Sequence, residues 1–181
     1  GIIIDRFEHT AVMQLRTPAA RETQTLLKDW LMAQNGIAHI YDKTVVDDKE
    51  IGWLTDAPKR ISFLENGLKM VVDPDEGQKT GAYLDQRDSH RLIRRYAKGR
   101  RVLDGFCYIG GFTLNALNAG AESVLSVDGS AEALNGVTTN VLTNFPQLGQ
   151  KHQIQRADMF EFLRDMETNA YDLIVLDPPA F

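Results

Sequence analysis

Four aspartates end or closely follow predicted strands in the second half of the chain, and they are well suited to binding a ligand. They are Asp104, Asp128, Asp158 and Asp177. Each stands at the end of a predicted strand, and ligands of open parallel sheets bind beyond the carboxyl ends of the strands. A carboxylate there accepts hydrogen bonds from hydroxyl and amino groups. Four such residues in succession predict one shared ligand site.

The segments around these aspartates suit an adenosine. Asp128 is placed to accept from two ribose hydroxyls, and Asp158 from an adenine amino group while Met159 packs on the ring. Gly110 and Gly111 let the backbone turn tightly and approach a ligand. The predicted ligand-binding residues here are Asp104, Phe106, Cys107, Tyr108, Gly110, Gly111, Asp128, Gly129, Ser130, Asp158, Met159 and Asp177.

The cofactor predicted from this pattern is S-adenosylmethionine. The dinucleotide fingerprint G-x-G-x-x-G fails, because Gly105 is followed only by Gly110 and Gly111. A Walker P-loop is also absent from the sequence. Asp104 and the bulky residues 106–108 suit a cationic amino-acid tail better than a diphosphate. A dehydrogenase is therefore the least favoured enzyme, and the histidine spacing suggests no metal site.

The run Asp177-Pro178-Pro179-Ala180-Phe181 indicates the methyl acceptor. It resembles the Asp/Asn-Pro-Pro-aromatic loop of base-modifying methyltransferases. The prolines stiffen the turn, the carboxylate can bond the edge of a base, and the aromatic ring can stack on a flipped base. A strand-ending Asp-Pro is also a common turn, so both interpretations stay open. The predicted catalytic residues are Asp177, Pro178, Pro179 and Phe181.

Strict alternation of strands and helices should position these residues. We expect strands at 101–104, 123–127, 152–155 and 173–176, and helices at 87–97, 112–119, 131–142 and 159–166. This pattern predicts a parallel α/β sheet with right-handed crossovers, a Rossmann-like methyltransferase sheet. The alternation stops after its fourth strand, so we expect a truncated sheet that belongs to a longer protein.

The first part of the chain predicts a small α+β domain over residues 1–85, with the Rossmann-like domain over 86–181. We expect strands at 2–5, 11–15 and 38–41, a helix opened by Pro18, and a hairpin of 61–64 with 68–72. Leu26, Leu27, Trp30 and Leu31 should face the core, and residues 47–50 should form a solvated loop.

Charge is distributed unevenly along the chain. Residues 102–181 hold 10 acidic and 3 basic side chains, whereas residues 1–101 hold 15 and 17. A phosphate-facing surface is therefore expected in the first half. The basic run from Arg87 to Arg101 fits phosphate contact and a solvated helix face equally well. One cysteine and no long apolar stretch favour a cytoplasmic protein without a membrane segment.

With these motifs, the chain resembles the large-subunit ribosomal RNA methyltransferases of the RlmI type. The matching segments are 1–7, 79–87, 102–112, 126–134 and 177–181. The resemblance implies an RNA substrate, 23S ribosomal RNA, and a PUA RNA-binding domain that this chain lacks. It also implies that Tyr83, Gln86 and Arg87 lie near the methionine part of the cofactor.

The resemblance further implies methylation of cytosine carbon 5, which needs a cysteine nucleophile. In the family that cysteine follows the next strand, beyond Phe181. We interpret Cys107 as a packed loop residue instead. Two alternatives remain: transfer to an exocyclic nitrogen of guanine, and a cofactor-binding module without activity. The oligomeric state stays open, with a dimer among the options.

Overall fold

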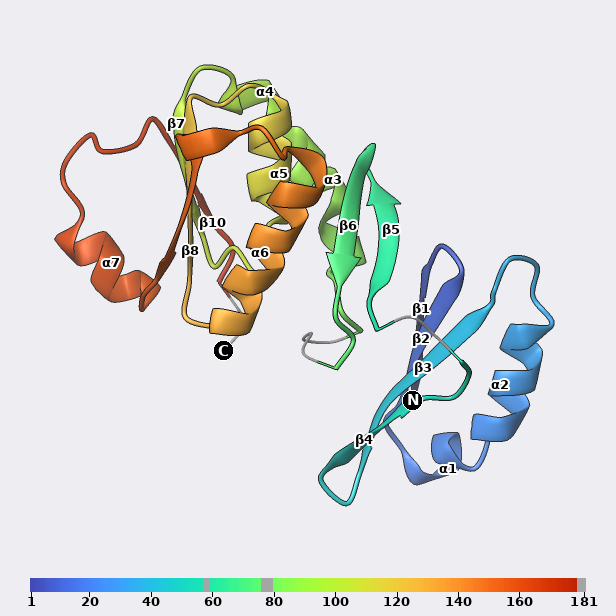
Figure 1. The fold of residues 1–181 in the computed structure, drawn as a ribbon. Helices are drawn as coiled ribbons and strands as arrows, with labels where there is room; N and C mark the ends of the chain where they lie inside the picture. The colour runs from blue at the N-terminus through green and yellow to red at the C-terminus, as the bar shows by residue number, and fades with distance from the viewer. Residues whose placement is uncertain (57–58, 76–79, 179–181) are drawn as a thin grey trace. The chain divides into compact units, whose positions relative to one another are not determined.

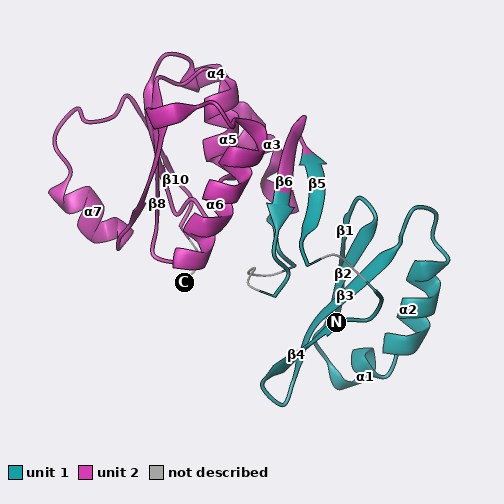
Figure 2. Ribbon diagram, in the orientation of Figure 1, with its two compact units in different colours: residues 1–64, 71–83 teal, residues 65–70, 84–181 magenta. Residues whose placement is uncertain are grey.

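The computed structural model describes residues 1–56, 59–75 and 80–178. It divides into two compact units (Figure 2), residues 1–64 with 71–83 and residues 65–70 with 84–181. The sequence-based domain boundary after residue 85 stays a prediction. No helix in the described ranges is long and apolar enough to cross a membrane.

The first unit contains a mixed four-stranded sheet in the order β1-β2-β3-β4. The crossover between the parallel strands β2 and β3 carries two short helices (Figure 1). The other two strand pairs are antiparallel. The elements are β1 Ile2–Phe7, β2 Thr10–Leu15, α1 Pro18–Arg21, α2 Gln24–Met32, β3 His39–Val46 and β4 Lys49–Trp53.

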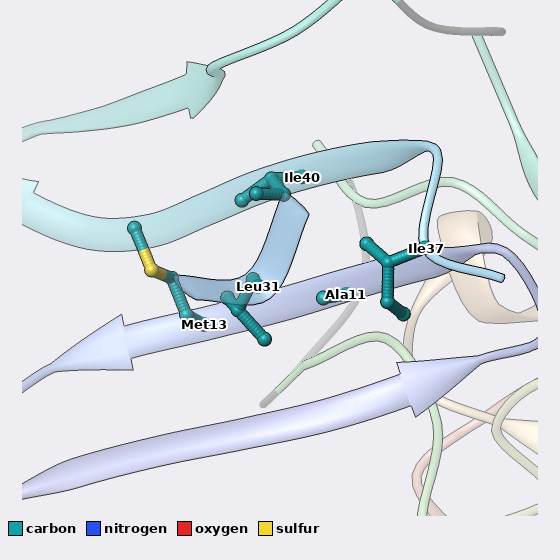
Figure 3. Close-up of a cluster of buried hydrophobic side chains, with 5 residues drawn as sticks. All are labelled: Ala11, Met13, Leu31, Ile37 and Ile40. Carbon is teal, nitrogen blue, oxygen red and sulfur yellow. The ribbon is translucent and has the colours of Figure 1, made fainter. Parts of the chain in front are cut away.

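Helix α2 packs on this sheet through one buried side chain, Leu31. Figure 3 shows Leu31 with Met13 and Ile40, which come from β2 and β3. The prediction that Trp30 belongs to the core is wrong, because 55% of its surface is exposed, and Leu26 is 70% exposed. Leu31 and the partly buried Leu27 face the sheet, so half of the expected apolar stripe faces outward.

Strand β4 corrects the predicted solvated loop at 47–50. Asp47 and Asp48 do form a turn, with φ of 49° and 62°. Lys49 and Glu50 then continue into β4 and pair with β3. Glu50 accepts a hydrogen bond from Tyr41 and forms an ion pair with Lys43. Charged residues on a short strand lack the alternation that identifies a strand in sequence.

The predicted hairpin is confirmed as β5 Ile61–Glu65 and β6 Leu68–Val72. Asn66 and Gly67 have φ of 53° and 81°, and positive values at both central positions are what a tight two-residue turn requires.

The second unit has a parallel sheet in the order β10-β7-β8-β9. Helices α5 and α6 lie on one face and α7 lies on the other (Figure 1), which confirms the Rossmann-like class. The expected helix over 87–97 is interrupted at Ile93. The elements are η1 Leu84–Gln86, α3 Arg87–Leu92, α4 Arg94–Ala97, β7 Arg101–Gly105, α5 Gly111–Asn118, β8 Ser123–Asp128, α6 Ala131–Asn144, η2 Gly149–Lys151, β9 His152–Arg156, α7 Met159–Asp165 and β10 Leu173–Leu176.

Candidate ligand site at the carboxyl edge of the sheet

The strand register brings the segments of all four predicted aspartates to one edge of the sheet. Asp104 pairs with Ser126 across β7 and β8, and Asp128 pairs with Arg156 across β8 and β9. The main-chain amide of Asp177 approaches the Gly105 carbonyl at 3.5 Å. Because parallel strands end at a common edge, residues distant in sequence converge here.

Asp104 is a buried carboxylate, with 1% of its surface exposed. Its Oδ2 accepts hydrogen bonds from the main-chain amide and the hydroxyl of Thr113, at 2.9 Å and 2.6 Å. Its Oδ1 is the one buried side-chain oxygen or nitrogen of the described residues without a hydrogen-bond partner. Burial raises the pKa of Asp104 to about 6, against the lowering effect of Thr113. A buried acceptor without a partner is costly unless a ligand supplies a donor.

The loop between β7 and α5 has an unusual backbone. Phe106 and Tyr108 have φ of 60° and 47°, a region that side chains other than glycine rarely adopt. Gly110 follows with φ of 88° and donates its amide to the Cys107 carbonyl at 2.8 Å. Backbone strain of this kind persists only where the surrounding structure fixes it, and it is frequent at functional sites.

Asp128 fixes that loop. Its Oδ2 accepts from the main-chain amide of Tyr108 at 3.0 Å, and its Oδ1 accepts from the amide of Ser130 at 2.9 Å. Ser130 in turn caps α6, because its hydroxyl accepts from the Ala133 amide at 3.1 Å. Gly129 between them is exposed. One carboxylate therefore holds the loops that follow two neighbouring strands.

Asp158 and Met159 have structural contacts of their own. Oδ1 of Asp158 accepts from the amides of Phe160 and Glu161, at 2.9 Å and 3.0 Å, and so caps the start of α7. Met159 is buried in a cluster with Leu103 and Val127. The predicted contacts of both residues with adenine stay predictions.

The structure gives the glycines near this edge a packing role. A Cβ on Gly105 would lie 2.7 Å from the sulfur of Met159, and a Cβ on Gly111 would lie 2.3 Å from the His90 ring. The imidazole of His90 contacts the buried carboxylate of Glu65 at 2.7 Å and packs edge-on against Phe112. Gly111 therefore makes room for a side chain, whereas the sequence suggested close approach to a ligand.

Sequence reasoning missed several residues that support the loops. The side-chain amide of Asn140, on α6, donates to the Ile109 carbonyl at 3.0 Å. Thr113 holds Asp104, and Ser126 contacts both Thr113 and His152. The signal was present for Ser126, which is a polar residue between the apolar residues Val124, Leu125 and Val127 of β8.

Cys107 has the environment of a packed residue. It is 5% exposed, and burial, followed by the charges of Asp104 and Asp128, raises the pKa of its thiol above the ordinary value. A thiolate is the reactive form of cysteine, so this setting disfavours a nucleophile.

The remaining predicted residues are spread more widely. Asp177 and Pro178 are exposed just after β10, and Pro179 and Phe181 lie outside the described residues. Tyr83 belongs to the first unit, whereas Gln86, at the end of η1, and Arg87, at the start of α3, belong to the second. Among the residues that the structure covers, no group of three or more His, Cys, Asp or Glu could hold a metal ion.

Fold and site together define an α/β protein of the methyltransferase type, with a buried carboxylate, Asp104, beside the loop between β7 and α5. The family model described as S-adenosylmethionine-dependent methyltransferase matches residues 8–181. The chain therefore belongs to this family.

A curated relative agrees with this assignment, and solved structures share the fold. A protein of Erwinia tasmaniensis named ribosomal RNA large subunit methyltransferase I is 41% identical over all of this chain, which spans 48% of that relative's length. A protein from Streptococcus mutans described as a SAM-dependent methyltransferase superposes with a TM-score of 0.83 and 24% identity, covering 99% of this chain and 48% of that one. A structure of a protein described as a methyltransferase complexed with SAH has a TM-score of 0.82, with the same identity and coverage.

Proposed function

We propose that the protein containing this chain transfers a methyl group from S-adenosylmethionine to carbon 5 of a cytosine in 23S ribosomal RNA, in the cytoplasm and without a metal ion. Family membership and the name of the relative from Erwinia support the reaction and the RNA substrate. The single observation that carries the cofactor assignment is Oδ1 of Asp104, a buried acceptor without a partner among the described residues.

The acceptor groups at this edge fit S-adenosylmethionine. Its ammonium group would neutralise Asp104, and its ribose hydroxyls would donate to Asp128, whose two oxygens each have a further lone pair. Two carboxylates at one edge would instead repel the diphosphate of a dinucleotide. Asp158 and Met159 would contact adenine, and Gln86, Arg87 and Tyr83 the methionine part.

When bound, the cofactor supplies an electrophilic methyl group on a sulfonium. The residues of this chain then orient it, because transfer requires an in-line approach of the acceptor and positioning provides much of the rate. Asp177, with Pro178, is exposed beyond β10, and its carboxylate can bond the edge of a base. Pro179 and Phe181 complete this proposed acceptor loop.

The basic residues of the segment from Arg87 to Arg101, which includes α3 and α4, divide into two groups. Arg94 donates to Asn115 and to the Asn66 carbonyl, and Arg101 forms an ion pair with Asp172. The guanidinium groups of both residues are therefore already engaged within the protein. The exposed members Arg91, Arg95, Lys98 and Arg100 form the proposed phosphate-contacting surface.

The cofactor assignment is tested by calorimetric titration of the intact protein with S-adenosylhomocysteine, 5′-methylthioadenosine and NADH. We expect micromolar-range binding of the first ligand, on the order of −8 kcal/mol, and none of NADH. Asp104→Asn should weaken S-adenosylhomocysteine far more than methylthioadenosine, which lacks the ammonium group, and Asp165→Asn on exposed α7 is the matched control. Equal loss for both adenosine ligands would contradict the role of Asp104.

The acceptor is tested by methylation of protein-free 23S ribosomal RNA with radiolabelled cofactor, followed by digestion to nucleosides. Label in 5-methylcytidine supports the proposal. Label in a methylated guanosine would favour the exocyclic-nitrogen alternative, and cofactor binding without transfer would indicate a binding module.

A further inference from the structure

A continuous chain of hydrogen bonds crosses the interior of the second unit from β9 to Asp104. Nε2 of His152 lies 3.0 Å from the hydroxyl of Ser126, and that hydroxyl lies 2.6 Å from the hydroxyl of Thr113. The Thr113 hydroxyl donates to Oδ2 of Asp104 at 2.6 Å. The relative exposures of Ser126, Thr113 and Asp104 are 0%, 0% and 1%, so these groups are shielded from bulk water.

The strand register creates this chain. Asp104 pairs with Ser126, and Val124 pairs with His152. Because alternate residues of a strand share a face, His152, Ser126 and Asp104 all point to the same side of the sheet. Thr113, in the first turn of α5 on that side, closes the gap between Ser126 and Asp104.

The direction of every hydrogen bond follows from the charge on Asp104. An ionised carboxylate only accepts, so the Thr113 hydroxyl must donate to it. The single proton of Ser126 must then go to Thr113, and Ser126 must accept from Nε2–H of His152. If Asp104 were protonated, the whole chain could reverse and His152 would carry its proton on Nδ1. The tautomer of His152 therefore reports the charge of Asp104 from two strands away.

We propose that Ser126 and His152 are positioning residues for the cofactor site: through Thr113 they hold the Asp104 carboxylate ionised and oriented, with Oδ1 free for the ammonium group of the cofactor. This inference rests on the proposed function. It assigns a role to residues in mid-sheet that touch no ligand and that sequence motifs do not identify.

The environment of His152 agrees with a neutral ring. Burial lowers the pKa of His152 to about 4, so near pH 7 one nitrogen donates and the other accepts. Chains of hydrogen bonds polarise one another in a low dielectric, which strengthens the bond that reaches the carboxylate.

The first test needs no ligand. Long-range proton–nitrogen NMR of the imidazole rings in the intact protein, with His152→Gln to assign the signal, gives the tautomer at pH 7.5. We expect the proton on Nε2 of His152. A proton on Nδ1, or a ring that changes tautomer freely, would overturn the proposal.

The second test compares two ligands. Ser126→Ala and His152→Leu should each weaken S-adenosylhomocysteine about tenfold, the size of one lost hydrogen bond to a charged network. Both should leave 5′-methylthioadenosine within about twofold, since it has no group for Asp104. His152→Gln retains an N–H donor and should bind like the wild type. Ser123→Ala, at the other end of β8, is the matched control.

The outcomes separate this inference from the proposed function. Equal weakening of both ligands, or no weakening of either, would show that the polar chain does not act through Asp104, while wild-type binding would still support the function. A wild-type protein that binds neither ligand would contradict the proposed function, and with it the positioning role. The NMR result would still decide whether the hydrogen bonds from His152 through Ser126 and Thr113 to Asp104 run in the inferred direction.

Discussion

The main-chain amide of Tyr108 donates a hydrogen bond of 3.0 Å to Oδ2 of Asp128. This bond ties the strained loop after β7 to the end of β8, while Oδ1 of the same carboxylate holds the amide of Ser130. Asp128 is thus a fixed part of the site before any ligand arrives. Its position is preorganised, so binding a ribose there requires little rearrangement.

Removing Asp128 should therefore weaken every adenosine ligand. Asp128→Ala removes the charged acceptor of the Tyr108 and Ser130 amides, two hydrogen bonds that are each worth about 1.5–3 kcal/mol. The loop at Tyr108 is then free to relax. We expect a loss of about 100-fold or more for both S-adenosylhomocysteine and 5′-methylthioadenosine, measured by calorimetry. Asp128→Asn retains one acceptor oxygen and should be intermediate. Loss confined to S-adenosylhomocysteine would contradict a ribose contact.

The raised pKa of Asp104 predicts that cofactor binding depends on pH. Burial raises the pKa of the Asp104 carboxyl to about 6, and a bound ammonium group would lower that pKa. S-adenosylhomocysteine affinity should then fall about tenfold per unit as pH drops below 6, with release of a proton on binding near pH 6. Calorimetry in buffers of different ionisation enthalpy measures this release. Methylthioadenosine should show neither effect.

The raised pKa of Asp104 affects stability in the opposite direction to cofactor affinity, because it lowers stability as the pH rises. The folded pKa of Asp104 lies above its ordinary value of 3.8, so the folded protein binds the proton more tightly. The stability that this group contributes is fully present below about pH 4 and is lost as pH rises through about 6. Asp104→Asn should remove that loss, which urea denaturation at pH 4.5 and pH 7 can measure. An unchanged pH dependence in the variant would indicate another group.

Much of the second unit could be predicted from the sequence because β7, β8 and β10 contain apolar runs and helices alternate with the strands. The strand at Leu173–Leu176 was predicted at its observed bounds, and the four aspartates converge as the topology requires. The contacts that hold Asp104 could not be predicted, since Thr113 and Ser126 meet only through strand register and helix placement. No local pattern contains that information.

The errors have physical causes of the same kind. Trp30 lies on a helix with regular apolar spacing, but the small sheet beneath α2 covers only Leu31 and its neighbours. Gly111 suggested close approach to a ligand, yet His90, from a helix 21 positions earlier, occupies the space beside it. Periodicity states which residues can be buried, and tertiary packing decides which ones are.

Packing at Gly111 gives a stability prediction. An alanine there would place its Cβ 2.3 Å from the His90 ring, and His90 is held by Glu65, so the ring cannot move away freely. Overpacking of this kind costs about 1–3 kcal/mol. We expect Gly111→Ala to lower the free energy of unfolding by that amount in urea denaturation. Gly129→Ala, whose nearest neighbour lies at 4.0 Å, should change stability little. Equal effects would refute the packing role.

The exposed arginines of α3 and α4 give a prediction about RNA. Arg91 and Arg95 have no carboxylate partner among the described residues, whereas Arg101 is paired with Asp172. A side chain that neutralises a phosphate releases counterions from the RNA. Replacing Arg91 and Arg95 by Gln should therefore reduce the slope of log affinity against log salt by about 0.7 for each phosphate that is no longer neutralised. Filter binding of a 23S ribosomal RNA fragment at several salt concentrations measures the slope.

The control for this experiment uses a basic residue outside the proposed surface. Arg164, exposed in the last turn of α7, allows the same change of charge on the opposite face of the sheet. Arg164→Gln should leave the salt slope unchanged, because a residue that does not meet phosphate releases no counterion on binding. If Arg164→Gln reduced the slope as much as Arg91→Gln, the attraction would arise from net charge, and α3 and α4 would not form the RNA-contacting surface.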